Sequence, residues 1–204
     1  MKHYKNCARA VSLVGLLLLS VATARAQDEV RYLELPNFHQ VNAQLYRGAQ
    51  PKAGGLAQLA HLGIKTIINL RADDDREDAE EREARALGLG YYNVPLPGLS
   101  RPKDAAVERA LALINDARLQ PVFVHCKRGA DRTGTIIACY RIRHDGWSAE
   151  AATSEAKRYG LSWFERGMKD YINDFARRAP TVLPPKTISR LFFSLRPRVA
   201  AGLI

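Results

Sequence analysis

Residues 121–134 read Pro-Val-Phe-Val-His-Cys-Lys-Arg-Gly-Ala-Asp-Arg-Thr-Gly, which is an apolar strand, a glycine-containing turn and the start of a helix. Successive backbone N–H groups in such a turn point at a bound anion, and the partial positive charge at the helix N-terminus favours a phosphate dianion. The same field favours the thiolate form of Cys126, which is the nucleophilic form of cysteine. This stretch therefore predicts a phosphate site that contains a nucleophile.

The side chains after Cys126 fit the same chemistry. Arg132 follows six residues later, and its planar guanidinium can bind two phosphoryl oxygens and follow their charge into the transition state. Thr133 can donate its hydroxyl to the sulfur and ease its departure when a phosphocysteine is hydrolysed. We predict Cys126 and Arg132 as catalytic residues. The predicted phosphate-binding residues are His125, Lys127, Arg128, Gly129, Ala130 and Thr133.

Short apolar, β-branched runs alternate with helical patterns on both sides of this stretch. Strands are predicted at residues 44–47, 65–70, 90–94 and 121–125, and helices at 56–61, 76–87, 104–118, 131–144, 148–159 and 168–178. The alternation favours an α/β fold with a small, mostly parallel central sheet flanked by helices.

The spacing of Cys126, Arg132 and the following Thr-Gly, after a histidine and an apolar strand, resembles the signature loop of the protein tyrosine and dual-specificity phosphatases. Residues 45–51 (Leu-Tyr-Arg-Gly-Ala-Gln-Pro) and 63–71 (Gly-Ile-Lys-Thr-Ile-Ile-Asn-Leu-Arg) are similar to segments of compact bacterial dual-specificity-like members. The resemblance covers about residues 44–178. It implies a phosphatase-like fold with no metal and no organic cofactor.

The general acid, which protonates the leaving oxygen, is less clear from the sequence. In the family that the chain resembles, an aspartate usually comes from a loop ahead of the signature, but the corresponding residues 95–102 contain no carboxylate. Asp131 and Asp104 are the two candidates, and another group or water stays open. Asp131 can instead pair with an arginine, and Asp104 can instead cap the helix that follows it.

Several basic residues surround this predicted site. Lys127 and Arg128 add positive charge at the rim, which raises the prospect of a substrate with more than one phosphate, such as an inositol phosphate or a phosphoinositide. Arg47 and Arg71 end predicted strands; each can line the cleft, although an arginine at a strand end is more often solvated.

Residues 1–26 have the pattern of a secretory signal peptide. A basic start precedes an apolar run at residues 10–22, and Ala24-Arg25-Ala26 is a small-x-small cleavage site. That run of about 13 residues is shorter than the roughly 20 of a membrane-spanning helix, so a retained anchor is the less favoured alternative. We expect an exported, periplasmic or secreted protein with a catalytic domain at residues 27–180. Residues 181–204 form a basic and apolar tail, for which a weak membrane-surface contact is an option.

The net charge indicates the class of substrate, and the cysteine content bears on whether a disulfide forms. Residues 1–26 carry four basic residues and no acidic ones, so their removal lowers the formal charge from +10 to +6, which suits anionic partners. We expect a phosphorylated protein or an inositol phosphate as substrate, and no nucleic acid. After residue 26 the cysteines are Cys126 and Cys139, and the apolar helical pattern around Cys139 predicts a buried, inert thiol with no disulfide.

The favoured function is a phosphomonoester hydrolase that forms a phosphocysteine and acts on phosphotyrosine, phosphoserine or phosphothreonine, or alternatively on inositol phosphates. The absence of a carboxylate from residues 95–102 keeps open a phosphate-binding module without turnover. A single loop cysteine also occurs in sulfur-transfer domains, which the pair Arg132 and Thr133 makes less fitting.

Overall fold

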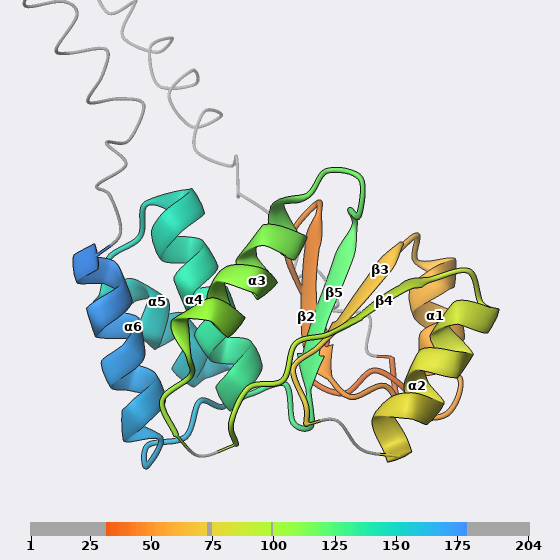
Figure 1. Ribbon diagram of the computed structural model, residues 1–204, viewed down its shortest axis with the longest axis horizontal. Coiled ribbons are helices and arrows are strands. Elements are labelled where there is room, and N and C mark those ends of the chain that lie inside the picture. The colour runs from red at the N-terminus through yellow and green to blue at the C-terminus, as the bar shows by residue number, and fades with distance from the viewer. Residues whose placement is uncertain (1–31, 73–74, 99, 179–204) are drawn as a thin grey trace, which may run out of the picture. The chain divides into compact units, whose positions relative to one another are not determined.

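The computed structural model describes residues 32–72, 75–98 and 100–178 of the 204-residue chain. The predicted signal peptide and the tail at residues 181–204 lie outside the described residues. A five-stranded sheet forms the centre, in the order β1-β2-β5-β3-β4 (Figure 1). β1 is antiparallel to β2 and the other neighbours are parallel. The strands are β1 (His39–Asn42), β2 (Leu45–Ala49), β3 (Thr66–Asn69), β4 (Gly90–Asn93) and β5 (Val122–Cys126).

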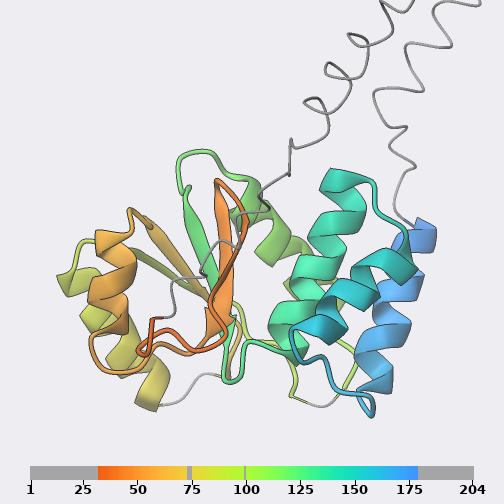
Figure 2. The ribbon, with the colours of Figure 1, turned by 180° about the vertical axis from the view of Figure 1, so that it is seen from behind.

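The helices cover the sheet on both sides, which makes three layers (Figures 1 and 2). One side carries α1 (Gly55–His61) and α2 (Asp75–Ala86). The other side carries α3 (Asp104–Asn115), α4 (Asp131–Asp145), α5 (Ala149–Arg158) and α6 (Arg166–Arg178). The predicted α/β fold with a mostly parallel, helix-flanked sheet is thus confirmed.

The central strand β5 is buried on both faces, so its sequence is apolar apart from His125. Side chains alternate across a strand. Val122, Val124 and Cys126 therefore join the core under α3 to α6, and Phe123 joins the smaller core under α1 and α2. This alternation decides which side of the sheet each side chain before the phosphate loop reaches.

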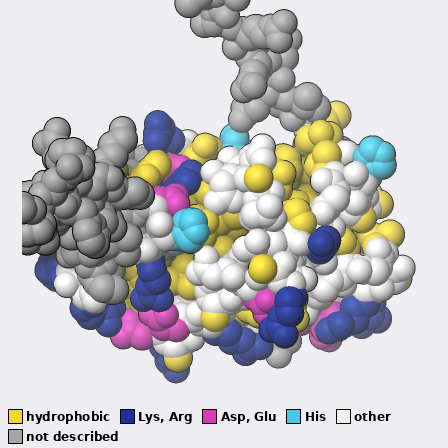
Figure 3. All heavy atoms as spheres, turned by 90° about the horizontal axis from the view of Figure 1, so that it is seen from above, with side chains coloured by type: hydrophobic (Ala, Val, Ile, Leu, Met, Phe, Trp, Pro, Cys, Tyr) yellow, Lys and Arg dark blue, Asp and Glu magenta, His cyan; other side chains and the backbone are white. Residues whose placement is uncertain are grey.

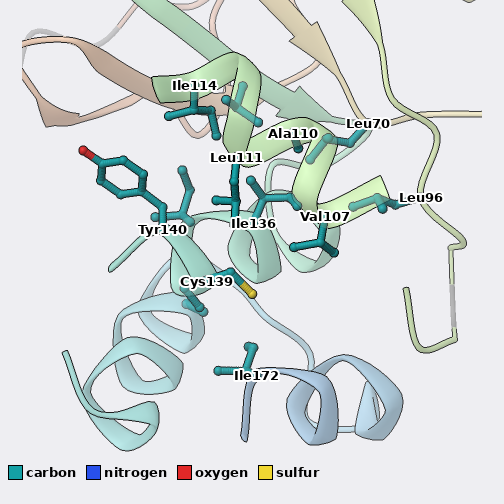
Figure 4. Packing of buried hydrophobic residues seen from close by; sticks show 14 of the residues in the cluster. Leu70, Leu96, Val107, Ala110, Leu111, Ile114, Ile136, Cys139, Tyr140 and Ile172 are labelled. Carbon is teal, nitrogen blue, oxygen red and sulfur yellow. The ribbon is translucent and has the colours of Figure 1, made fainter. Parts of the chain in front are cut away.

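The larger core is built where α3, α4 and α6 meet. Figure 4 shows Leu111, Ile136 and Ile172 from these three helices pointing toward one another, with Cys139 among them. Cys139 is fully buried, and burial raises the pKa of its thiol. Cys126 and Cys139 are both free thiols. The prediction of a buried thiol at Cys139, outside any disulfide, is confirmed.

The boundaries of the elements follow the predictions within a few residues, with one strand missed. β1 (His39–Asn42) is a polar edge strand that exists through its pairing with β2, so its own residues carry no strand pattern. The helix predicted to reach residue 118 ends at Asn115, because Asp116 leaves helical geometry and binds Arg118 instead. Ser148 caps the start of α5, since its hydroxyl accepts a hydrogen bond of 3.2 Å from the amide of Ala151.

Charged side chains of both signs lie mixed along the edge of the face seen in Figure 3. No helix among the described residues is long and apolar enough to cross a bilayer. Within those same residues, no group of three histidine, cysteine or acidic side chains is placed to hold a metal ion.

Candidate active site

Cys126 is the last residue of the central strand β5, and its side chain is 3% exposed. It pairs in register with Ala49 of the neighbouring strand β2. Residues 127–130 form the loop after it, and α4 begins at Asp131. The structure therefore contains the predicted succession of strand, phosphate loop and helix N-terminus.

Two side chains hold the carbonyl oxygens of the phosphate loop (residues 127–130) on its outer side. Arg47 donates from Nη2 to the carbonyl of Gly129 at 2.7 Å, and Asn37 donates from Nδ2 to the carbonyl of Arg128 at 3.1 Å. Among the residues that the structure describes, no acceptor pairs with the backbone N–H groups of residues 127–133. Those N–H groups are the donors that a bound phosphate would use.

Arg47 is 1% exposed, and its guanidinium is bonded to the phosphate loop at Gly129. The centre of its guanidinium is 4.4 Å from the ring centroid of Tyr159, a cation–π contact. Burial lowers the pKa of Arg47 to about 10, so the group stays charged at neutral pH. Arg71 is 6% exposed. The interpretation of both arginines as solvated strand ends was wrong. Arg47 instead holds the phosphate loop through its hydrogen bond to the carbonyl of Gly129.

Gly129 is where the phosphate loop meets β2. Its φ is +68°, and a Cβ there would lie 2.4 Å from the carbonyl carbon of Gly48 and 2.5 Å from the amide nitrogen of Ala49. Only glycine fits such an approach between two backbones.

We expect Gly129→Ala to lower the free energy of unfolding by roughly 2–5 kcal/mol, because it combines left-handed strain with overpacking. Chemical denaturation measures this loss. Gly88→Ala is the matched control, since Gly88 has a φ of +75° but nothing within 4 Å of its added Cβ. Equal losses in the two variants would show that the contact with β2 contributes nothing.

Cys126 and Arg132 line one pocket. Arg132 donates from Nη1 to the carbonyl of Leu70 at 3.4 Å, which ties it to the end of β3. The rim residues Lys127 and Arg128 are exposed. The full lining is Gly98, Cys126, Lys127, Arg128, Asp131, Arg132 and Glu165.

Asp131 lies in this pocket and is 7% exposed. Its Oδ2 accepts a hydrogen bond from Nη2 of Arg128 at 2.5 Å, and its Oδ1 accepts from the amide of Ser162 at 2.9 Å. Both carboxylate oxygens are thus occupied by donors from the protein. The second bond also attaches the loop between α5 and α6 to the start of α4.

Asp104, the other predicted acid, does not line the pocket. Its carboxylate accepts from the hydroxyl of Tyr171 at 2.7 Å and from Nη1 of Arg178 at 2.8 Å, both on α6. The hydrogen bond from Arg178, with that from Tyr171, lowers the pKa of Asp104 to about 2. The prediction that Asp104 caps α3 was wrong, because the cap position is Lys103 and Asp104 ties α3 to α6 instead.

His125 was predicted to bind substrate, but its side chain lies on the opposite face of the sheet from Cys126. Strand alternation requires this, because the two residues are adjacent in β5. The ring is fully buried, stacks on Phe123 at 5.6 Å, and has Nε2 3.0 Å from a carboxylate oxygen of Glu80 on α2. His125 therefore joins β5 to α2 and does not line the pocket.

The side chains of Ala130 and Thr133 are also absent from the pocket lining. Ala130 is 5% exposed and packs close to Gly160. The Thr133 hydroxyl is buried and has no hydrogen-bond partner among the described residues. Its role toward the sulfur stays a prediction, and Gly129 and Ala130 can serve a phosphate through their backbone amides alone.

Glu165 is the ionisable residue of the pocket lining that the sequence patterns did not indicate. It lies between two predicted helices, in a segment without periodicity or motif. A topological signal exists, however. The helix α5 runs back along α4, so the connection from α5 to α6 returns to the end of the sheet where α4 begins, as Figure 2 shows.

Comparison with known proteins agrees with this geometry. Dual specificity protein phosphatase TpbA of Pseudomonas aeruginosa (strain UCBPP-PA14) is 35% identical over 126 residues, which are 61% of this chain and 55% of TpbA. The chain thus matches little more than half the length of that relative. Inositol diphosphatase DSP5 of Arabidopsis thaliana is 29% identical over 145 residues, covering 69% of this chain and 70% of DSP5.

Solved structures show the same fold. The crystal structure of a P. aeruginosa TpbA variant in complex with pTyr superposes with a TM-score of 0.58 at 29% identity, covering 78% of this chain and 91% of that chain. The core catalytic domain of the PP-IP phosphatase SIW14 from S. cerevisiae gives a TM-score of 0.64 at 21% identity, covering 80% of this chain and 95% of that chain.

A family model described as "DSP-PTPase phosphatase fused to NAD+ Kinase" matches residues 27–171, which is more than half of the chain and includes the whole pocket around Cys126. With the loop geometry and the relatives above, the chain belongs to this family of cysteine-dependent dual-specificity phosphatases.

Proposed function

We propose that this protein hydrolyses phosphate monoesters through a covalent phosphocysteine on Cys126. The observation that carries the proposal is the meeting of Cys126, Arg132 and the unpaired amides of the phosphate loop in one pocket. A nucleophile, a bidentate cation and convergent backbone donors are the groups that phosphoryl transfer needs.

The two steps follow from these positions. In the first, the Cys126 thiolate forms a bond to phosphorus while the bond from phosphorus to the leaving oxygen breaks, and that oxygen takes a proton from an acid in the pocket. In the second, a water oxygen attacks phosphorus, the S–P bond breaks and the proton of the water passes to the same group. Arg132 and the loop amides hold the phosphoryl oxygens in both steps.

Phosphotyrosine, phosphoserine and phosphothreonine in proteins are the proposed substrates. The TpbA variant bound to pTyr supports a protein substrate, at 29% identity. An inositol phosphate is the second candidate, because Lys127 and Arg128 both line the rim and because a relative is named an inositol diphosphatase.

A phosphate-release panel separates these substrates. Phosphopeptides that carry each of the three phosphorylated residues are compared with inositol phosphates, on wild type and on Lys127→Met. Faster release from phosphopeptides, with little effect of Lys127→Met, supports the protein substrate. Faster release from inositol phosphates, lost mainly in Lys127→Met, supports the second candidate. Tight binding of every ligand with no release would contradict turnover and leave a phosphate-binding module.

We also propose export, on the pattern of residues 1–26, which lie outside the described residues. Expression of the full chain in a bacterial host, followed by mass determination of the product, tests this. A mature protein that begins at Gln27 in the periplasmic fraction supports export, and an intact N-terminus in the cytoplasm contradicts it.

A further inference from the structure

Glu165 presents a buried carboxyl group to the proposed active site. It precedes Arg166, the first residue of α6, and it is 2% exposed while lining the same pocket as Cys126 and Arg132. Within the described part of the chain, neither of its carboxylate oxygens has a hydrogen-bond partner. An ionised carboxylate without donors is costly to bury, so this environment favours the protonated form.

The charged groups that act on Glu165 lie on the phosphate loop, on α4 and on α6. Burial raises the pKa of Glu165, and the negative charge of Asp131 raises it further, while Arg128, Lys169 and Arg132 lower it by smaller amounts. Because the net direction is upward, Glu165 holds its proton to a higher pH than an exposed glutamate does. A general acid needs its proton at the working pH.

The loop that carries Glu165 is held in place from two sides. The amide of Ser162 donates to Asp131 at the start of α4. On the other side, a Cβ added to Gly167 would lie 2.8 Å from the amide nitrogen of Arg101, so α6 begins in direct contact with the loop after β4. These contacts place the carboxyl at the pocket through the backbone, with no hydrogen bond to the carboxyl itself.

The other two predicted acids are engaged elsewhere. Both oxygens of Asp131 accept hydrogen bonds, from Arg128 and from Ser162. The Asp104 carboxylate is held by Tyr171 and Arg178 outside the pocket. Residues 95–102, which correspond to the loop where the family usually has an aspartate, contain no carboxylate. Glu165 is therefore the carboxyl in the described pocket that has no protein donor.

We propose that Glu165 is the general acid of the phosphatase reaction, an assignment that rests on the function proposed above. Its carboxyl gives its proton to the leaving oxygen as the bond between phosphorus and that oxygen breaks. The resulting carboxylate then takes a proton from the water that attacks the phosphocysteine, which restores the carboxyl as the S–P bond breaks. Proton and electron pairs balance over the two steps without a further reactant.

The leaving group tests this assignment. Phenyl phosphate expels a basic phenolate that needs a proton, and 2,4-dinitrophenyl phosphate expels an anion that does not. We expect Glu165→Gln to lower kcat/KM for phenyl phosphate by roughly 10²-fold or more, the usual size of general acid catalysis, and to leave 2,4-dinitrophenyl phosphate within a few-fold. The basic limb of the pH profile for phenyl phosphate should also disappear in the variant.

Glu150→Gln, at an exposed glutamate of α5, is the matched control and should match wild type on both substrates. Asp131→Asn and Asp104→Asn are measured beside it. An equal loss on both substrates in Glu165→Gln, with weaker inhibition by vanadate, would mean that Glu165 only positions Arg132 and would overturn the proposal. A larger leaving-group dependence in either aspartate variant would overturn it as well.

The activity of the wild type shows whether a negative result concerns the assignment of Glu165 or the proposed phosphatase function. If wild type hydrolyses neither aryl phosphate, the proposed phosphatase function fails and the assignment fails with it; if wild type hydrolyses both, only the assignment is tested.

Thermal stability shows whether the Glu165→Gln variant is folded. A raised pKa in the folded state stabilises the fold at low pH, and this stability is lost as the pH rises above the ordinary glutamate range of about 4.3. Glu165→Gln escapes that loss, so its Tm at pH 7 should equal or exceed that of wild type.

Discussion

Cys126→Ser is expected to abolish phosphate release, with a loss of kcat on the order of 10⁶-fold, as when other covalent hydrolases lose their nucleophile. Serine keeps the size and place of the side chain at the end of β5, but a neutral hydroxyl is a weak nucleophile without an adjacent base. His125 cannot act as that base, because it lies on the opposite face of the sheet. Release of inorganic phosphate from an aryl phosphate measures the loss.

Binding should survive the same substitution. The phosphate loop amides and Arg132 are unchanged in Cys126→Ser, so phosphotyrosine should still bind, as calorimetry would show. Cys139→Ala is the matched control, since this second thiol is fully buried between α3, α4 and α6 (Figure 4). It should retain kcat/KM and show only a lower Tm. Residual hydrolysis near the wild-type rate in Cys126→Ser would refute a phosphocysteine intermediate.

Arg132→Lys is expected to lower kcat/KM by roughly 10²- to 10³-fold, in the range found when one transition-state donor is removed. Lysine preserves the charge but not the planar fork that binds two phosphoryl oxygens together. The substitution also removes the hydrogen bond from Nη1 of Arg132 to the carbonyl of Leu70, which helps to orient the guanidinium. Most of the loss should appear in kcat, because the guanidinium of Arg132 stabilises the charge on the phosphoryl oxygens mainly in the transition state.

The control for this substitution is Arg85→Lys, at a side chain of α2 that is 60% exposed and paired with Glu81. It makes the same chemical change away from the pocket and should leave kcat/KM within error of wild type, because exposed ion pairs contribute little. A loss in Arg132→Lys that appears only in KM would show that Arg132 binds the ground state without favouring the transition state.

Much of the fold could be predicted because its signals are local. The β-branched run of β3, the apolar run of β5 and the Ser148 cap each mark their element within a few residues. The edge strand β1 was missed because its residues, His-Gln-Val-Asn, become a strand only through hydrogen bonds to β2.

The sequence by itself determined the centre of the site. Cys126, Arg132 and the loop between them lie within seven consecutive residues, so a strand, a tight turn and a helix start bring them together without help from the rest of the chain. The glycine at position 129 belongs to the same local signal, because its left-handed backbone is a property of the turn.

Only the tertiary structure decided which side chains support this centre and which carboxyl faces it. Arg47 holds the carbonyl of a residue 82 positions away, and Glu165 comes from the connection between α5 and α6. Asp104 does not line the pocket, because its carboxylate accepts hydrogen bonds from Tyr171 and Arg178 of α6. The burial, the hydrogen-bond partners and the pKa of a side chain depend on contacts between elements that form only when the sheet and its helices pack together. A local sequence pattern does not specify those contacts.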